Sequence, residues 1–118
     1  MRDHRKLIAF DKADDLTMTI YKISFSFPRE EIFGFTSQIR RAAVSLTTNI
    51  VEGAARESEV EFLRFLEVSF ASYREVEYQF SLAKRLKYVK ENDIEMCESK
   101  INETGKVLAA LIRKLRNK

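Results

Sequence analysis

The sequence is short of the residues that break helices and of those that build chemical sites. Its 118 residues include one proline and three glycines, so we expect long uninterrupted helices. The single cysteine, Cys97, excludes a disulfide within the chain and a metal site made of several thiolates. The single histidine, His4, lies in a charged terminal segment, so one chain cannot supply a histidine triad or a histidine metal cluster.

A phosphate-binding glycine loop is also missing, because the glycines are isolated from one another. Cys97 falls on an apolar helical stripe, where burial is expected to raise the pKa of its thiol and leave it unreactive. Glu52 and Glu77 lie near arginines and small polar residues, which favours ion pairs across helices over a catalytic carboxylate pair. We therefore expect a protein that is not an enzyme and needs no metal or cofactor. An enzyme with a site shared between subunits is the least favoured class.

The charge is unevenly distributed along the chain. Its net value is only +3, but cations collect without acids over residues 84–90 and 106–118. Cations at helix C-termini offset the helix dipole, so these clusters indicate either helix stabilisation or a surface for nucleic acid. Residues 1–15 hold no apolar stretch suited to a secretory signal or a membrane span, and we expect a cytoplasmic protein without a membrane partner.

Apolar spacing predicts four helices, over residues of about 6–25, 29–55, 59–88 and 93–116. The connections between them are short, and short connections make neighbouring helices antiparallel. The expected fold class is therefore all-α: an antiparallel up-and-down four-helix bundle that forms a single domain over residues 1–118.

Local signals set the expected helix ends. Pro28 ends the first helix and opens the second, whose first turns are expected to be disturbed by Gly34. Ser58 followed by Glu61 indicates a capping box at the start of the third helix. The expected cap of the fourth helix is one of two neighbouring residues, Asn92 or Asp93.

Two neighbouring stripes run along residues 27–56. The first is apolar and expected to be buried, and consists of Ile39, Ala43, Leu46, Ile50 and Gly53. The second is mostly small and polar, lies between Arg41 and Arg56, and consists of Gln38, Ala42, Ser45, Asn49 and Glu52. Short polar side chains set between cations indicate a contact surface, either for another helix or for an anionic ligand.

The first and third expected helices carry more apolar surface than one bundle needs. Residues 59–88 show two stripes, formed by Leu63, Leu66, Phe70, Tyr73 and Phe80 and by Phe62, Phe65, Val76, Ala83 and Leu86. A small four-helix bundle needs roughly one stripe per helix. We predict self-association, because a large apolar patch seldom faces water on a soluble monomer. The alternative is that a single bundle buries these aromatic side chains unaided.

The segment around residues 27–66 resembles the four-helix-bundle proteins encoded in intervening sequences of bacterial 23S ribosomal RNA genes. The resemblance is carried by FPREE at 27–31, SQIRRAAVS at 37–45, NIVEG at 49–53, Arg56 and FLRFL at 62–66. Weaker similarity covers most of the chain, including Ala13, Leu16, Tyr21 and LAKRL at 82–86. The chain departs from the family's usual Gly-Ser and Glu-Leu pairs at Ala71-Ser72 and Glu75-Val76, where the closest helix approach is expected to loosen.

This resemblance implies a ring-like homo-oligomer, a pentamer with a central channel. A related family, the accessory variability determinants of diversity-generating retroelements, is similar in fold and associates with nucleic acid and a reverse transcriptase. A ring repeats each modest basic patch around its axis, so the summed field can hold a polyanion that one copy would barely attract.

We therefore predict a non-catalytic oligomer that binds structured RNA or other nucleic acid through basic helix faces. The expected binding residues are Arg40, Arg41, Arg56, Lys84, Arg85, Arg113 and Lys114, because guanidinium and ammonium groups hold phosphate. The expected signature and interface residues are Gln38, Ser45, Asn49, Glu52 and Gly53. If the arginines instead form salt bridges between subunits, the protein is an interaction scaffold with a polypeptide partner and no nucleic acid.

Overall fold

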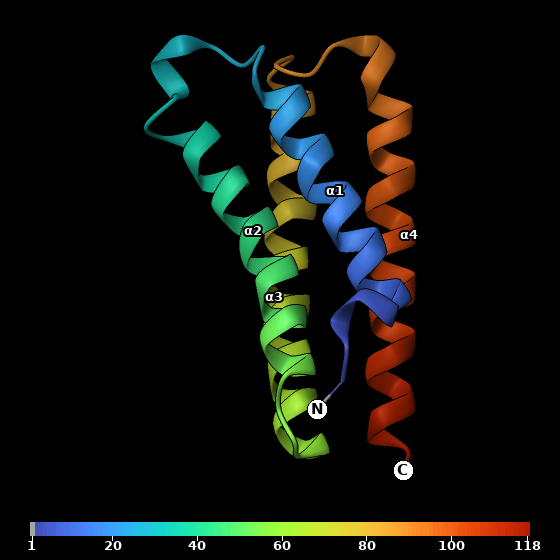
Figure 1. Ribbon diagram of the computed structural model, residues 1–118. Helices are drawn as coiled ribbons and strands as arrows, with labels where there is room; N and C mark the ends of the chain where they lie inside the picture. Colours follow the sequence, from blue (N-terminus) through green and yellow to red (C-terminus); the bar gives the residue numbers. More distant parts are fainter. Residues whose placement is uncertain (1) are drawn as a thin grey trace.

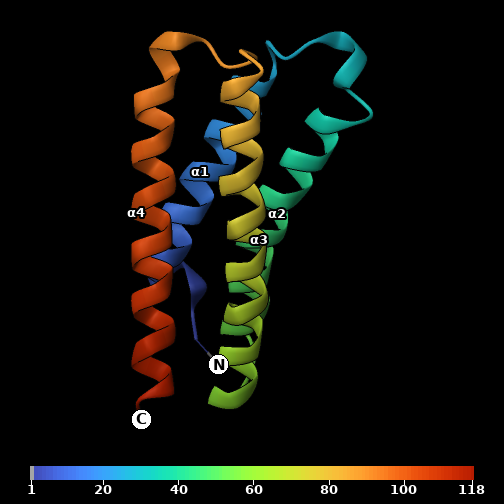
Figure 2. The same cartoon turned by 180° about the vertical axis from the view of Figure 1, so that it is seen from behind.

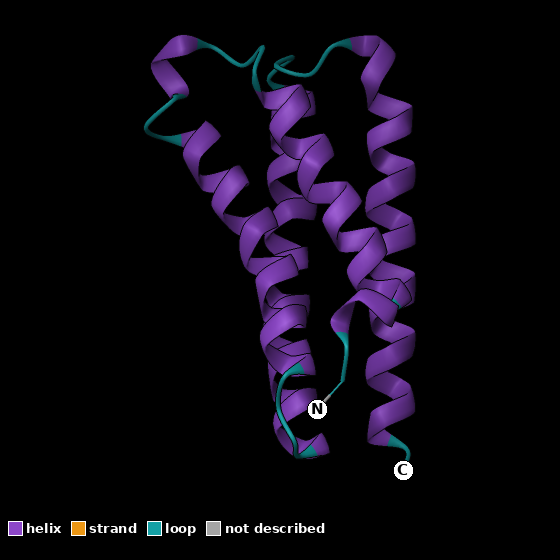
Figure 3. Cartoon of the chain, in the orientation of Figure 1, coloured by secondary structure: helices purple, strands orange, loops and turns teal. Residues whose placement is uncertain are grey.

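The computed structural model describes residues 2–118, which form four α-helices and no strand (Figure 1 and Figure 3). The helices are α1 (Ile8–Ser24), α2 (Phe35–Ala54), α3 (Glu59–Arg85) and α4 (Glu91–Arg116), with short 3-10 turns at η1 (His4–Lys6) and η2 (Arg29–Glu31). No described helix combines the length and the apolar character needed to cross a membrane.

The helices stand side by side in an elongated bundle with extents of 44 × 26 × 20 Å. Contacts join α1 to α2, α2 to α3, α3 to α4 and α4 to α1, so each helix has two neighbours (Figure 2). Successive helices run in opposite directions. We call the end that holds both chain termini and the α2–α3 connection the terminus end, and the end that holds residues 25–34 and 86–90 the loop end (Figure 1).

The core confirms the apolar stripe predicted on α2. Ile39, Ala43, Leu46 and Ile50 are fully buried. Each large aliphatic side chain buried in this way contributes about 1.5–3 kcal/mol to the free energy of folding. On the neighbouring stripe of the same helix, the Ser45 hydroxyl lies 2.8 Å from the Ser72 hydroxyl of α3, so part of that stripe is occupied within the chain.

The two apolar stripes of α3 pack against its two neighbouring helices, α2 and α4. Phe62, Leu66, Val76 and Phe80 are all buried, because α3 packs against α2 on one side and α4 on the other. A helix flanked by two partners needs a wider apolar arc than one stripe, so most of the apparent surplus on α3 is used inside the bundle.

The opening of α2 is shorter than its sequence pattern indicates. We expected helix from Arg29, but residues 29–31 form only the η2 turn and α2 begins at Phe35. The amide of Gly34 donates to the carbonyl of Glu31 at 3.0 Å, which closes a turn in place of a helical bond. Gly34 is the N-cap of α2, with φ of −118° and ψ of −108° and no side-chain capping bond, so the expected disturbance at this glycine is confirmed.

The ends of α3 show one correct prediction and one error. Ser58 caps α3 by accepting a hydrogen bond from the Glu61 amide at 3.0 Å, as its sequence indicates. The helix ends at Arg85 and not at Tyr88, because Lys87 adopts a left-handed conformation with φ of 63°. The Tyr88 amide donates back to the Ala83 carbonyl at 2.9 Å, which is the Schellman arrangement at a helix C-terminus.

The predicted cap of α4 is wrong. The helix begins at Glu91, and its N-cap is Lys90, which makes no side-chain capping bond. Asn92 and Asp93 therefore lie inside the first turn. An acidic side chain there still interacts favourably with the helix dipole, which explains why the segment tolerates a start without a capping side chain.

Candidate nucleic-acid interface

The predicted binding cations fall into two groups at different levels of the bundle. Arg56, Arg113 and Lys114 lie at the terminus end, where α2 ends and α4 ends (Figure 1). The loop-end half carries the other four, Arg40, Arg41, Lys84 and Arg85. The 27 residues of α3 separate the two ends by about 40 Å, at ~1.5 Å per residue. One compact binding site cannot hold all seven.

The terminus-end group is built by the last turns of α4 next to the start of α3. Arg116 pairs with Glu67 at 2.6 Å, and Lys118 pairs with Glu59 at the same distance, which fixes α4 against α3. Arg113 and Lys114 are exposed, and neither forms an ion pair with a described residue. Two cations at this end therefore face solvent without a carboxylate partner.

Arg56 extends the same group from the end of α2. Its guanidinium lies 4.7 Å from the centre of the Phe65 ring, and it makes no ion pair with any residue in the range 2–118. Stacking on an aromatic ring holds the guanidinium plane in place without consuming its hydrogen-bond donors. Arg56 is thus positioned while its charge stays available.

Sequence reasoning missed Arg2, which lies in the same charged terminal segment as His4. Its backbone amide donates to the Ala54 carbonyl at 2.8 Å, and its guanidinium donates to the Arg56 carbonyl at 3.0 Å. The guanidinium also lies 4.2 Å from the centre of the Phe62 ring. These contacts tie Arg2 to the α2–α3 connection, and its guanidinium also pairs with Glu59 at 4.0 Å, so the cation that Arg2 adds to the terminus end has a carboxylate partner. No periodic signal in a short charged segment could have indicated it.

Arg40 in the loop-end half is engaged within the chain. Its Nε donates to the Ser24 hydroxyl at 2.8 Å, and a terminal nitrogen donates to the Tyr21 carbonyl at 3.4 Å. The guanidinium lies 4.9 Å from the Tyr21 ring and 5.2 Å from the Phe25 ring. Arg40 therefore closes the end of α1 on α2, whereas its neighbour Arg41 is exposed and makes no ion pair with a described residue.

The pair at the end of α3 also has partners within the chain. Lys84 pairs with Glu98 at 2.8 Å, and the Nε of Arg85 donates to the Ser81 carbonyl at 3.3 Å. Both contacts fit the helix-stabilising interpretation of this basic cluster, since the first joins α3 to α4 and the second holds the Arg85 side chain against the backbone of its own helix.

The small polar stripe of α2 lies largely between helices of the same chain. The Ser45 and Ser72 hydroxyls lie 2.8 Å apart, and the Asn49 amide donates to the Ser45 carbonyl at the same distance. A Cβ on Gly53 would stand 2.8 Å from the Phe65 Cβ, so α2 and α3 meet closely here. The other two signature residues, Gln38 and Glu52, are exposed.

The Cys97 thiol is buried in the core of the bundle. Burial raises the pKa of the Cys97 thiol to about 11, consistent with a core thiol. Among residues 2–118, no cluster of three or more histidine, cysteine, aspartate or glutamate side chains is arranged to hold a metal ion. What the arrangement offers is exposed positive charge on a rigid helical frame.

Comparison with known proteins gives a family and a fold. The family model for 23S rRNA-intervening sequence proteins matches residues 5–110. The crystal structure of a Bacteroides thetaiotaomicron protein of unknown function, from the S23 ribosomal protein family, matches with a TM-score of 0.80 and 24% sequence identity. The match covers 90% of this chain and 96% of the other, and at this identity it shows a shared fold. No curated protein matches the chain.

Proposed function

The chain belongs to the family of 23S rRNA-intervening sequence proteins, and on that premise we propose that it is a non-catalytic oligomer that binds structured RNA or other nucleic acid. The observation that supports this proposal is the terminus-end group of cations. Arg56, after α2, and Arg113 and Lys114, on α4, lie at the same end of the bundle without ion-pair partners among the described residues. Their arrangement suits contacts with phosphate and supplies no code for reading bases.

Self-association is the second part of the proposal. Met18 on α1 and Phe25, the residue that caps its C-terminus, are 61% and 80% exposed, so part of the apolar surplus of the first helix is not covered within the chain. Exposed apolar surface of this kind marks interaction sites. A ring-like assembly, with five copies as the family resemblance implies, repeats the terminus-end cations around one axis. Their summed field attracts a polyanion that one copy holds weakly. The proposed location is the cytoplasm.

A protein-interaction scaffold is the second candidate. The internal contacts of Arg40 favour it, because this predicted phosphate ligand is already engaged on α1. Ile32 and Phe33 also favour it, since these neighbouring side chains are 52% and 96% exposed, and adjoining exposed apolar surface is where protein contacts form. In this case the arginines hold helices and subunits together, and nucleic acid has no part.

RNA binding at two salt concentrations separates the candidates. Fluorescence anisotropy with a structured RNA should show affinity that falls steeply between 50 and 200 mM salt, on the order of the tenfold or greater losses typical of several phosphate contacts. The triple variant R56Q/R113Q/K114Q should bind much more weakly and show a shallower salt dependence. Its matched control, R29Q/K87Q/K90Q, removes the same charge from exposed loop-end cations and should retain most of the affinity.

Two outcomes contradict nucleic-acid binding at this surface. Absence of binding by the unmodified chain at low salt favours the scaffold. Equal losses in the terminus-end variant and in its control indicate attraction to net charge alone, with no defined surface.

A further inference from the structure

A hollow between α3 and α4 is lined by cations and by no acidic side chain. Its volume of ≈ 390 Å³ suits a small ligand, and its lining consists of Phe70, Tyr73, Arg74, Asn102, Gly105, Lys106, Ala109 and Arg113. Arg74 pairs with Glu77 at 2.8 Å, so its charge is already neutralised. Lys106 and Arg113 form no ion pair with a described residue. The hollow therefore offers two available cations to an anionic group.

A buried hydroxyl at this hollow has no hydrogen-bond partner. Tyr73 is only 4% exposed, and its hydroxyl forms no hydrogen bond with a residue in the range 2–118. It lies against Gly105, and both residues line the hollow. Burial raises the pKa of this tyrosine, so the hydroxyl keeps its proton at neutral pH. Buried polar groups are normally paired, so an unpaired donor beside a hollow points to a ligand that accepts its hydrogen bond.

Phe70 gives the hollow an apolar wall beside these polar groups. Its half-buried side chain also lines an adjacent hollow of ≈ 220 Å³, which shares Ala109 and Arg113 with the first. The Arg74 guanidinium lies 5.3 Å from the centre of the Phe70 ring, so a planar group against this ring would also meet a guanidinium. Aromatic rings and guanidinium planes beside free cations suit an aromatic ligand that carries negative charge.

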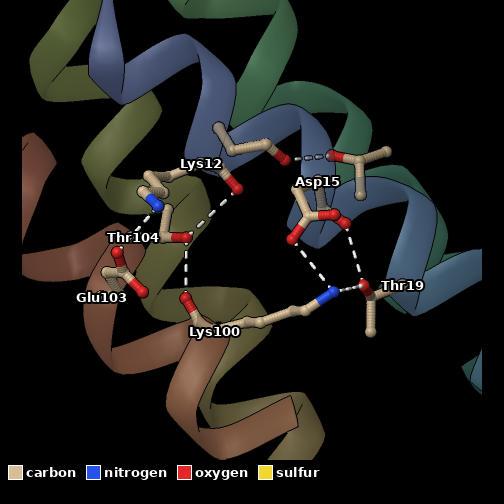
Figure 4. Close-up of polar contacts among 8 residues, drawn as sticks. Lys12, Asp15, Thr19, Lys100, Glu103 and Thr104 are labelled. Atoms are coloured by element: carbon tan, nitrogen blue, oxygen red, sulfur yellow. Dashed lines mark hydrogen bonds and ion pairs between the residues drawn. The ribbon is translucent and has the colours of Figure 1, made fainter. Parts of the chain in front are cut away.

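The hollow on the other side of α4 differs in its charges. It lies between α1 and α4, has a volume of ≈ 270 Å³ and is lined by Lys12, Asp15, Met96, Ser99, Lys100, Glu103 and Thr104. Lys12 pairs with Glu103 at 2.8 Å. Lys100 pairs with Asp15 at 3.0 Å and donates to the Thr19 hydroxyl at the same distance (Figure 4). Both cations of this second hollow are neutralised within the chain, so it offers no free charge to an anion.

Ion pairs on either side of the α3–α4 hollow hold the two helices in place. Toward the terminus end, Arg116 pairs with Glu67 at 2.6 Å. Toward the loop end, Lys84 pairs with Glu98 at 2.8 Å. The contacts of α4 with α1 hold the helix from its other side (Figure 4). The hollow is therefore preformed, and a ligand does not have to order its walls.

We propose that the α3–α4 hollow binds a single nucleotide, with the base against Phe70 and the phosphate at Lys106 and Arg113. The Tyr73 hydroxyl then donates a hydrogen bond to the base or to the sugar. A nucleotide matches the hollow group by group, because it combines a planar aromatic ring, hydrogen-bond acceptors and an anion.

Arg113 connects this site to the proposed function. It belongs to the terminus-end cations and also lines the hollow, so an RNA backbone held by those cations can place one of its nucleotides there. A base inside a duplex is stacked on both faces and cannot enter, whereas an unpaired base can. For RNA, the inference rests on the proposed function and narrows it to RNAs with an unpaired nucleotide. A free nucleotide carries the same groups, so the tests separate the two sources.

Two RNA hairpins that differ by one bulged adenosine test the RNA source. In fluorescence anisotropy, the unmodified chain should bind the bulged hairpin about tenfold more tightly than the fully paired one, because a base gains a stacking partner. Tyr73→Phe removes a hydroxyl that has no partner in the chain, so the packing stays intact. This variant should weaken binding of the bulged hairpin about three- to tenfold and leave the paired hairpin unaffected.

Matched controls separate the site from general effects on the chain. Tyr78→Phe removes a hydroxyl from an exposed tyrosine of the same helix and should bind both hairpins as the unmodified chain does. Lys106→Gln should reduce the preference for the bulged hairpin, because the phosphate of the unpaired nucleotide loses a cation. Lys90→Gln removes the same charge from the loop end and should leave that preference unchanged.

AMP is the probe for the free-nucleotide source. At millimolar concentration it should shift the backbone amide resonances of Asn102, Gly105 and Lys106 in the unmodified chain, and Tyr73→Phe should reduce these shifts. Shifts with AMP and no preference for the bulged hairpin assign the hollow to free nucleotides. A preference for the bulged hairpin that depends on the Tyr73 hydroxyl assigns it to RNA.

Two results overturn the nucleotide site. One is equal affinity for the two hairpins together with AMP spectra in which these amides do not shift. The other is a Tyr73→Phe protein that keeps both the full preference for the bulge and the full AMP shifts. A chain that binds neither hairpin contradicts the proposed function instead, and the AMP spectra then decide on the nucleotide site by themselves. The two failures are therefore distinguishable.

Discussion

The hydroxyl of Tyr73 occupies the space that a side chain at position 105 would need. Tyr73 on α3 is buried, and its hydroxyl and ring edge press on the backbone of α4 at Gly105. Burial raises the pKa of this tyrosine, as expected for a hydroxyl removed from water. The glycine therefore sets how closely α3 and α4 approach, although it stands in the middle of a helix where glycine is normally unfavourable.

Gly105→Ala should destabilise the protein by about 1–3 kcal/mol, because overpacking outweighs the gain of ~1 kcal/mol that alanine gives inside an exposed helix. Urea unfolding measures this change. Adding Tyr73→Ala should reduce the effect of the alanine at position 105, since the obstructing side chain is gone. An unchanged or raised stability in the single variant would show that the helices move apart at no cost.

Adjacent arginines on α2 should differ in their importance for stability. Arg40→Lys should cost about 1–2 kcal/mol, because a lysine cannot keep the hydrogen bond to Ser24 and the contacts with two aromatic rings together. Arg41→Lys is the matched control and should stay within about 0.5 kcal/mol of the unmodified chain. Thermal unfolding of both variants checks this. Equal effects would contradict the structural role of Arg40.

The Cys97 thiol should react slowly with thiol reagents in the folded protein. It should also make the free energy of unfolding depend on pH in the alkaline range. Its pKa in the folded chain is about 11, and an unfolded thiol ionises near 9. The folded state thus keeps the proton that the unfolded state loses, so the contribution to stability is complete below pH 9 and declines toward pH 11. The stability advantage over Cys97→Ala should shrink between pH 8 and pH 10.5 in urea unfolding. A thiol that reacts rapidly with a disulfide reagent at pH 8 in the folded protein would contradict its burial.

The sequence predicted the structure best where residue spacing or a single local hydrogen bond decides the conformation. The buried stripe of α2 and the Ser58 cap of α3 follow from spacing and from one hydrogen bond, and both are found. The start of α2 and the end of α3 were missed because turns compete with helix there. Residues 29–31 form a 3-10 turn, and Lys87 takes a left-handed conformation that sequence patterns assign to glycine.

Site prediction was limited by contacts between distant segments. The spacing of Arg40 and Arg41 places both near the surface of α2, but only the position of α1 decides that Arg40 is engaged and Arg41 is free of ion pairs within residues 2–118. The bundle likewise decides that Arg56 lies at the same end as Arg113 and far from Arg85. Charge counts along a chain cannot supply such distances.

The mass of the unmodified chain in solution tests the central claim most directly, because the proposed function requires several copies to associate. Light scattering coupled to size-exclusion chromatography should give a multiple of the 13.8 kDa chain mass, with fivefold as the value implied by the family resemblance. A mass of 13.8 kDa across the micromolar range would contradict the account.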